Sequence, residues 1–210
     1  SEMCIRDSPQ KGCKGEVTVD RCVDFIDECG DANRDILVKS DTEESRKLLV
    51  KCILRERDDG KTVVEEAPKK VKGSNGIVER AVREIEGRIR ALKLSLEHRI
   101  GKKVDAKERI VAFMPNYAAY LYNRLHKGDD GKVAYERIKG KRQTVIGVEF
   151  GEKVLYTKYR GNHMEKINSR FSPGIMVGAN RRSNDFLVMN KEGLHTTRTI
   201  KRIVDKWSCL

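Results

Sequence analysis

The chain has 210 residues, of which 38% are hydrophobic and 36% are charged, and its formal net charge is +12. This length suits one domain, or one domain with a small module. No run approaches the roughly 18–20 apolar residues of a membrane span, and no secretory signal pattern is present, so we expect neither a membrane protein nor a secreted one.

The positive charge is unevenly distributed. Residues 1–72 carry 15 basic and 17 acidic residues, whereas residues 73–210 carry 29 and 15. A basic half beside a nearly neutral half favours a polyanionic partner that is contacted mainly by the later residues. The alternative interpretation is that the protein is basic but has no such partner.

The first third of the chain alternates helical and strand-like patterns. Residues 1–8 do not join this pattern, and we interpret them as a non-native leader. The elements that we expect next are a helix over 17–29 that Gly30 ends, a strand over 36–40, a helix over 44–57 and a strand over 62–65. The strand over 36–40 is followed directly by Asp41.

A long helix follows, over residues 73–96, and Ser74 or Asn75 can cap it. Its apolar residues recur in steps of three and four, which predicts one buried face: Val78, Val82, Ile85, Ile89, Leu92 and Leu96. A charged stripe with the same steps lies on another face: Glu79, Arg83, Glu86, Arg90 and Lys93. By composition alone, that stripe is a solvated face with salt bridges.

The remaining residues predict one more helix and a β region. The helix spans 110–125, and Pro115 should kink it or delay its start. We interpret its tyrosines as core residues. Short alternating strands follow, which predicts a small antiparallel barrel or meander: 148–156, 174–178, 185–189 and 195–200.

Two features together carry a resemblance to a known family. Asp41 ends a strand, and 37 residues separate it from Glu79 within the run Asn75-Gly76-Ile77-Val78-Glu79-Arg80. This arrangement resembles the second half of the Asp-Asp-Glu core of retroelement integrases. The wider sequence resembles the integrase region of copia-type retrotransposon polyproteins.

The resemblance implies a fold and a domain organisation. We expect an α/β fold, an incomplete RNase H-like integrase core, followed by a small all-β module. The expected parts are a leader (1–8), a partial catalytic core (9–126), a linker (127–144) and a basic β module (145–207). The first strand of the core, with its Asp, lies upstream of the matched region, so we expect an N-terminally truncated core.

The resemblance also implies a chemistry, DNA strand transfer with two Mg²⁺ or Mn²⁺ ions held by carboxylates. Asp41 and Glu79 are then the catalytic, metal-binding residues, with carboxylates within about 8 Å of each other. The third carboxylate is missing. We therefore expect the chain to be inactive alone, and whether it is an enzyme stays open.

DNA is the expected partner, and the residues expected to contact it are Lys72, Asn75, Arg83, Arg90, Arg181, Arg182, Lys201 and Arg202. No small-molecule substrate is expected, and a homo-oligomer stays open. The six cysteines form no CxxC pair, which favours a reduced, intracellular setting. The family implies the nucleus. Alternatives are a non-catalytic nucleic-acid-binding remnant and a structural domain without a DNA role.

Overall fold

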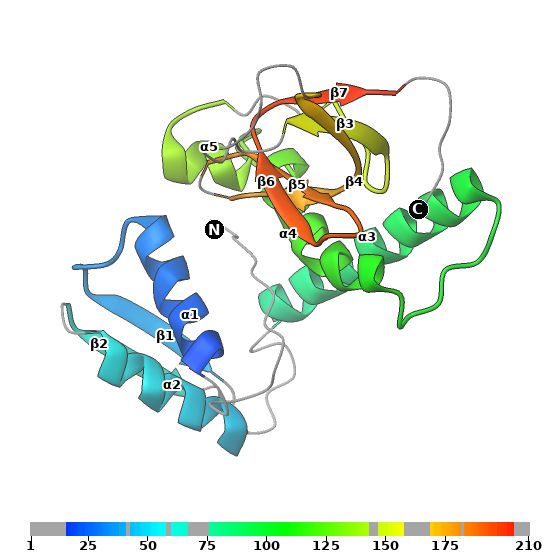
Figure 1. The fold of residues 1–210 in the computed structure, drawn as a ribbon. Helices are drawn as coiled ribbons and strands as arrows, with labels where there is room; N and C mark the ends of the chain where they lie inside the picture. The colour runs from blue at the N-terminus through cyan, green and yellow to red at the C-terminus, as the bar shows by residue number, and fades with distance from the viewer. Residues whose placement is uncertain are drawn as a thin grey trace.

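The computed structural model describes residues 16–40, 43–57, 60–66, 76–142, 147–157, 169–181 and 183–203. Its elements are, in order, α1 Glu16–Cys29, β1 Ile36–Ser40, α2 Glu44–Glu56, β2 Thr62–Glu66, α3 Gly76–Ile100, the 3-10 helix η1 Arg109–Phe113, α4 Met114–Leu125, α5 Ala134–Lys139, β3 Lys153–Thr157, β4 Phe171–Ala179, β5 Phe186–Met189, β6 Leu194–Thr197 and β7 Ile200–Arg202. Figure 1 shows α1 to β2 on one side, which we call the N-terminal unit, and α3 to β7 on the other, which we call the body.

The N-terminal unit is built around two parallel strands. β1 and β2 pair from Ile36–Thr62 to Ser40–Glu66. Parallel neighbours need a crossover connection, and α2 supplies it. Gly30 adopts a left-handed conformation with φ +88° and ends α1, as the sequence predicts. Both predicted helices and both predicted strands of this region are confirmed.

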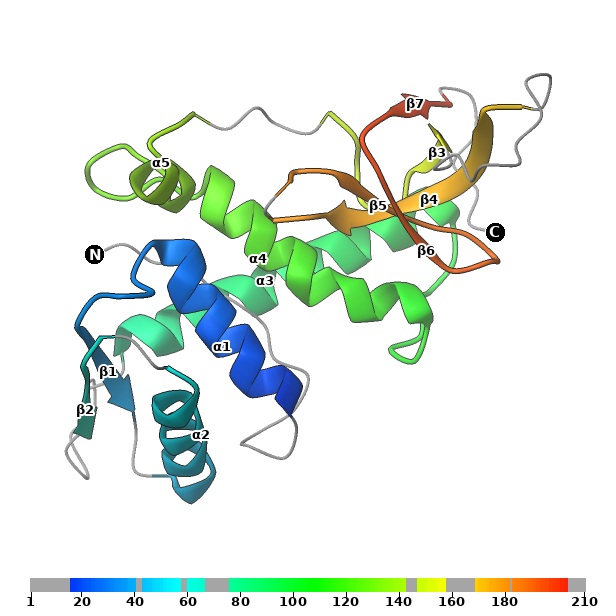
Figure 2. The ribbon, with the colours of Figure 1, turned by 60° about the vertical axis from the view of Figure 1, so that its left-hand side comes forward.

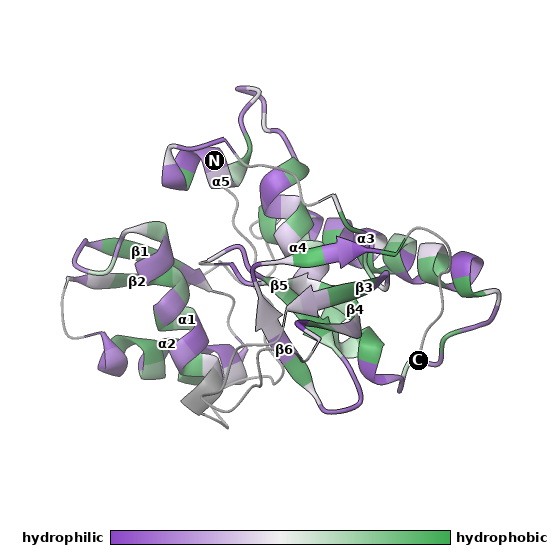
Figure 3. Cartoon of the chain, turned by 45° about the horizontal axis from the view of Figure 1, so that its top comes forward, coloured by the Kyte–Doolittle hydropathy of each residue, from purple (hydrophilic) through white to green (hydrophobic). Residues whose placement is uncertain are grey.

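The strands of the N-terminal unit leave apolar residues uncovered. Ile36 and Val38 are half-buried, whereas Leu37 between them is 62% exposed. Val63, the register partner of Leu37, is 45% exposed. Figure 3 shows apolar (green) residues along β1 and β2. In the described residues β1 has only this one strand as a partner.

α3 is buried over only part of the predicted stripe. Leu96 is 1% exposed, but Val78 and Val82 are 64% and 51% exposed, and Ala81 is buried in their place. The reason is length. The 25 residues of α3 make a rod of roughly 37 Å, whereas its main partner α4, with 12 residues, extends for roughly 18 Å. Figure 2 shows α4 lying across the middle of α3.

α4 starts late rather than kinking. Pro115 lies in its first turn, where the missing amide proton is not needed, and the residues before it form η1. Tyr117, Tyr120 and Tyr122 are all at most 5% exposed, so the interpretation of the tyrosines as core residues is confirmed. Burial raises the pKa of Tyr117 to about 12.

The predicted β region is a five-stranded antiparallel sheet with strand order β6-β5-β4-β3-β7. One hydrophobic cluster joins it to the helices, and its fully buried members include Met114 from α4, Val154 and Tyr156 from β3, and Met176 from β4. Gly151 approaches Leu96 so closely that a Cβ there would lie 2.5 Å from the leucine Cδ1. The end of α3 is therefore fixed in this core.

The fold thus mixes helices with a parallel strand pair and an antiparallel sheet. The RNase H-like topology and the domain boundaries stay predictions. The hydrophobic cluster crosses the predicted boundaries between 126 and 145, and α5, which the sequence did not predict, lies in the expected linker.

None of the helices in the described residues is long and apolar enough to cross a membrane.

Candidate nucleic-acid interface

The structure describes one of the two predicted metal ligands. Glu79 lies in the first turn of α3 and is exposed to solvent. β1 ends at Ser40, as predicted, so Asp41 follows the carboxyl end of that strand in sequence. Asp41 itself lies outside the described residues, as do Lys72, Asn75 and Arg182. The expected closeness of the Asp41 and Glu79 carboxylates stays a prediction.

The implied two-metal centre stays a prediction, because Asp41 lies outside the described residues. Within the ranges that the structure describes, no group of three or more His, Cys, Asp or Glu side chains is arranged to hold a metal ion. Glu79 makes no ion pair with any described residue, and a single exposed carboxylate cannot hold two ions. We therefore derive no catalytic step through a metal.

A groove of about 820 Å³ opens at the start of α3, next to Glu79 in the sequence. Arg80 and Arg83 form one side. They are three residues apart on a helix, so their side chains leave from neighbouring positions on one face. Both are exposed, and neither makes an ion pair with another described residue. They are therefore available to an anionic ligand.

The opposite side of the groove comes from α4 and the turn that follows it. Tyr122 and His126 are four residues apart, and their rings stack with centroids 4.5 Å apart. The Arg88 guanidinium lies 5.2 Å from the centroid of the Tyr122 ring. Burial raises the pKa of Tyr122, so its hydroxyl stays neutral, whereas the exposed His126 ring borders the groove.

A third cation of the groove is already neutralised. Arg137 donates to both carboxylate oxygens of Asp130, at 2.5 and 3.1 Å. The hydrogen bonds from Arg137 and, to a smaller extent, the one from the Lys132 amide hold the pKa of Asp130 well below its usual range. The pair fixes the turn between α4 and α5. Among the described residues, the lining arginines without a carboxylate partner are therefore Arg80 and Arg83, and Asp129 adds an exposed carboxylate to the lining.

The other predicted DNA contacts do not join this groove. Arg90 is exposed two turns further along α3, 4.0 Å from Glu86. Arg181 lines a separate pocket. Lys201 and Arg202 lie on β7, one of the two edge strands of the sheet, away from the start of α3 in both ribbon views (Figures 1 and 2).

Arg202 has a structural partner. Its Nε donates to Glu152 Oε1 at 2.5 Å, and the Glu152 side chain is almost fully buried. This hydrogen bond raises the pKa of Arg202. Lys201 lies over the Phe171 ring, 4.4 Å from its centroid. Replacing Arg202 would therefore leave a buried carboxylate without its partner, and it is a poor probe of DNA binding.

Sequence reasoning found Arg83 but missed Arg80, Tyr122 and His126. Arg80 was visible as the last residue of the matched Asn-Gly-x-x-Glu-Arg run. The spacing of four between Tyr122 and His126 places them on one face of a helix, but only the tertiary packing of α4 on α3 brings that face to Arg80.

Comparisons with known proteins place the chain in no family. No family model and no curated protein matches it. One chain of the cryo-EM structure of a simian T-cell lymphotropic virus intasome in complex with PP2A regulatory subunit B56 gamma is 12% identical, with a TM-score of 0.39, over 90% of this chain and 64% of that one. This chain thus spans less than two thirds of that one, and a likeness this weak does not establish a shared fold.

Proposed function

We propose that this chain binds DNA as part of an integrase-related retroelement protein, and that the groove at the start of α3 receives the phosphate backbone. The observation that carries the proposal is the pair of exposed cations, Arg80 and Arg83, in a groove that directly follows Glu79 on the same helix. Integrase relatedness itself is inferred from the motif in the sequence.

The backbone around the motif supports the proposal. β1 ends one residue before Asp41, its neighbour β2 runs parallel to it, and α3 begins at Gly76 inside the matched run. Sites in open α/β sheets lie at the carboxyl ends of parallel strands. The end of β1 and the start of α3 thus lie next to the two carboxylates on which the integrase resemblance rests.

The groove is suited to a phosphate backbone rather than to base edges. Two arginines can each donate a fork of hydrogen bonds to phosphate oxygens, which positions a nucleic acid without reading its sequence. The His126 ring at the opposite wall offers an aromatic face to a sugar or base. We therefore expect binding with little sequence preference.

Catalysis is the finer part of the proposal. In an integrase-related site, Asp41 and Glu79 would be ligands of Mg²⁺ or Mn²⁺, and the matched motif provides two of the three carboxylates that two-metal strand transfer uses. We expect the chain alone neither to nick nor to join DNA. A nicking assay with a supercoiled plasmid and either metal tests this, and metal-dependent nicking that Glu79→Gln removes would contradict it.

DNA binding is tested by charge reversal in the groove. We would measure the affinity for a fluorescent duplex by anisotropy at several salt concentrations, for the parent chain and for Arg80→Glu/Arg83→Glu. Each lost phosphate contact should reduce the slope of log K against log salt by about 0.9. The double variant should therefore bind more weakly, with a slope flatter by about 1.8.

The matched control is Lys51→Glu/Arg55→Glu, which changes the net charge equally at exposed positions of α2. It should leave the slope nearly unchanged. Equal losses in the two double variants would show that net charge, not the groove, drives binding. Tight binding by the groove variant with an unchanged slope would place the DNA elsewhere.

A further inference from the structure

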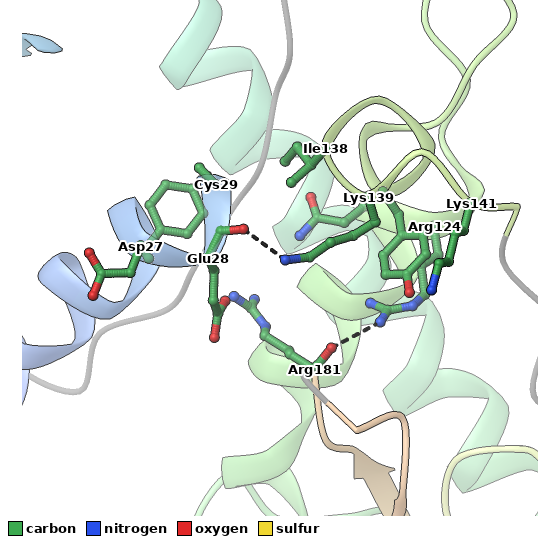
Figure 4. Close-up of a pocket in the computed structure, with 11 residues that line it drawn as sticks. Asp27, Glu28, Cys29, Arg124, Ile138, Lys139, Lys141 and Arg181 are labelled. Carbon is green, nitrogen blue, oxygen red and sulfur yellow. Dashed lines mark hydrogen bonds between the residues drawn. The ribbon is translucent and has the colours of Figure 1, made fainter. Parts of the chain in front are cut away.

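A second pocket, of about 620 Å³, lies between the C-terminal end of α1 and the body, and it shares no lining residue with the α3 groove. Residues of α1 form one wall, and residues of α4, α5 and the β4–β5 turn form the other (Figure 4). The Lys139 side chain reaches from the body to α1, where its Nζ donates to the backbone oxygen of Glu28 at 2.9 Å. The volume of this pocket lies in the range of small-molecule sites, roughly 300–1,000 Å³.

The wall on the side of the body is cationic. Its basic residues come from α4, α5, the segment after α5 and the β4–β5 turn: Arg124, Lys139, Lys141 and Arg181. Figure 4 shows Arg181 extending toward Glu28, with Arg124, Lys139 and Lys141 on the body side. Four cations converging from three segments, α4, the end of α5 with the residues after it, and the β4–β5 turn, make a site for an anion such as a phosphate.

Arg124 is the fixed member of this wall. It is 8% exposed, and its guanidinium carbon lies 3.8 Å from the centroid of the Tyr120 ring and 4.5 Å from that of Tyr135. Its Nη2 donates to the backbone oxygen of Arg181 at 3.4 Å. Two aromatic rings and a carbonyl thus hold a charged group in place before any ligand arrives, which lowers the entropy cost of binding.

The α1 wall has the opposite chemistry. Glu28 brings a carboxylate, which accepts hydrogen bonds from hydroxyl and amino groups, and Phe25 brings an aromatic face, whereas the Asp27 carboxylate points away from the cationic wall (Figure 4). Tyr135 adds a second aromatic ring on the side of the body. The ligand must therefore carry an anionic end, hydrogen-bond donors and a flat ring system.

We propose that this pocket binds a nucleoside monophosphate, either free or as the phosphorylated end of a nucleic-acid strand. The phosphate lies against Lys139, Lys141 and Arg181, the sugar hydroxyl faces the Glu28 carboxylate, and the base stacks on Phe25. A bare inorganic anion would leave the aromatic and acidic groups of the pocket unused. The proposal does not depend on DNA binding at the α3 groove.

The test is calorimetric titration of the full chain with five probes: dAMP, adenosine, inorganic phosphate, and a short oligodeoxyadenylate with and without a 5′-phosphate. We expect dAMP to bind at least about tenfold more tightly than adenosine or phosphate alone, since each lacks one charged or stacked contact. Binding of dAMP identifies a free nucleotide as ligand. Binding of the 5′-phosphorylated oligonucleotide alone identifies a strand end.

Two variants locate the ligand. Lys141→Glu alters an exposed cation and should weaken binding about tenfold without affecting folding. Phe25→Leu keeps an apolar side chain but removes the aromatic face, and it should weaken dAMP more than phosphate. The matched control is Lys102→Glu, an exposed charge reversal outside the pocket. Arg80→Glu/Arg83→Glu should leave dAMP binding intact even if DNA binding is lost.

Two results would overturn the proposal. The first is the absence of binding by both dAMP and the phosphorylated oligonucleotide. The second is binding that Lys141→Glu and Lys102→Glu weaken equally, because that would indicate a general charge effect. If Phe25→Leu unfolds the chain, the comparison of Lys141→Glu with Lys102→Glu still decides.

Discussion

The N-terminal unit and the body have equally well-marked helices and strands, but they bury apolar side chains very differently. In the body, Met114, Val154 and Tyr156 are fully buried in one cluster. In the N-terminal unit, Val19, Val50 and Ile53 are buried but lie outside that cluster, and Leu37 and Leu48 are more than half exposed. A sequence pattern is thus enough to make an element, whereas burial depends on how many partners the element finds.

Sheet size explains the difference. The two-stranded sheet of the N-terminal unit has α1 and α2 as partners, whereas the five-stranded sheet of the body joins α3, η1 and α4 in one cluster. Two strands alone are marginal in water and need packing to be stable. The N-terminal unit compensates with polar ties, and the main one is Arg57.

Arg57 links three parts of the N-terminal unit. Its Nη2 donates to the backbone oxygens of Asp31, Ala32 and Arg34 at 2.9–3.1 Å, and its Nη1 contacts Thr62 Oγ1. It thus connects the end of α2 with the loop before β1 and with the first residue of β2. Truncation of a buried apolar side chain should therefore destabilise the body, and loss of the Arg57 hydrogen bonds should destabilise the N-terminal unit.

The largest expected effect is that of Leu96→Ala in the body. Leu96 is 1% exposed and packs against Gly151, so its truncation leaves a cavity. It should lower the free energy of unfolding by about 2–5 kcal/mol, measured by urea denaturation. The control Leu48→Ala, at a 54% exposed position, should change it by less than about 0.5 kcal/mol. Equal losses would mean that the two regions are packed alike.

Arg57→Lys should have the next largest effect. Lysine keeps the charge but has only one side-chain nitrogen, so it cannot donate both to the loop carbonyls, which accept from Nη2, and to Thr62 Oγ1, which accepts from Nη1. We expect a loss of about 1.5–3 kcal/mol, seen as faster amide hydrogen exchange in β1 and β2 while the strands of the body stay protected. Arg55→Lys, exposed in the last turn of α2, is the control. Unchanged exchange in Arg57→Lys would contradict the role of the tie.

A smaller, pH-dependent effect is expected for Glu97→Gln at the end of α3. The amide of Val104, at 2.9 Å, and then the Lys103 side chain hold the pKa of Glu97 below 4.5. The stabilisation is therefore present above pH 4.5 and is lost as the pH falls through the lowered pKa. The variant should be less stable than the parent at neutral pH, and this gap in stability should disappear at acid pH.

Thermal unfolding monitored by circular dichroism at several pH values measures that gap. Glu86→Gln, on the exposed face of α3, serves as the control and should track the parent at every pH. A gap for Glu97→Gln that stays constant down to acid pH would show that packing, not ionisation, makes the difference.

The smallest change in stability is expected for Leu37→Ser. Leu37 and its partner Val63 form an exposed apolar pair on the open sheet face, so the substitution should alter the free energy of unfolding by less than about 0.5 kcal/mol. Exposed apolar sheet surface favours association. Light scattering should therefore show less self-association in the variant. Unaltered association would exclude this face as its cause.

Local patterns in the sequence predicted most of the elements. The alternation of residues and the position of Gly30 marked α1, β1 and α2 to within a residue or two, and Pro115 marked the start of α4. The exposure of Val78 and Val82 could not be predicted, because it depends on how far α4 extends along α3. α5 was not predicted, because its six residues are too few to show a helical period.

The candidate site was predicted only in part. The matched motif identified Glu79, and the integrase resemblance identified Arg83, one turn further along the same helix. The groove opposite them depends on the packing of α4, and the second pocket joins α1 to α5 across a large gap in the sequence, so neither leaves a local pattern. Basic residues such as Arg202 looked available in the sequence, because the buried partner Glu152 is 50 positions away.

The hydrogen bond from Lys139 to Glu28 has a consequence for the order of folding. It joins residues 111 positions apart, so it closes a far longer loop than the contacts within either region. Closing a long loop costs more chain entropy, and contacts of this kind form late. The N-terminal unit and the body should therefore each form first and dock afterwards. The pocket between them then exists only in the finished molecule, and a ligand bound there would slow the first step of unfolding.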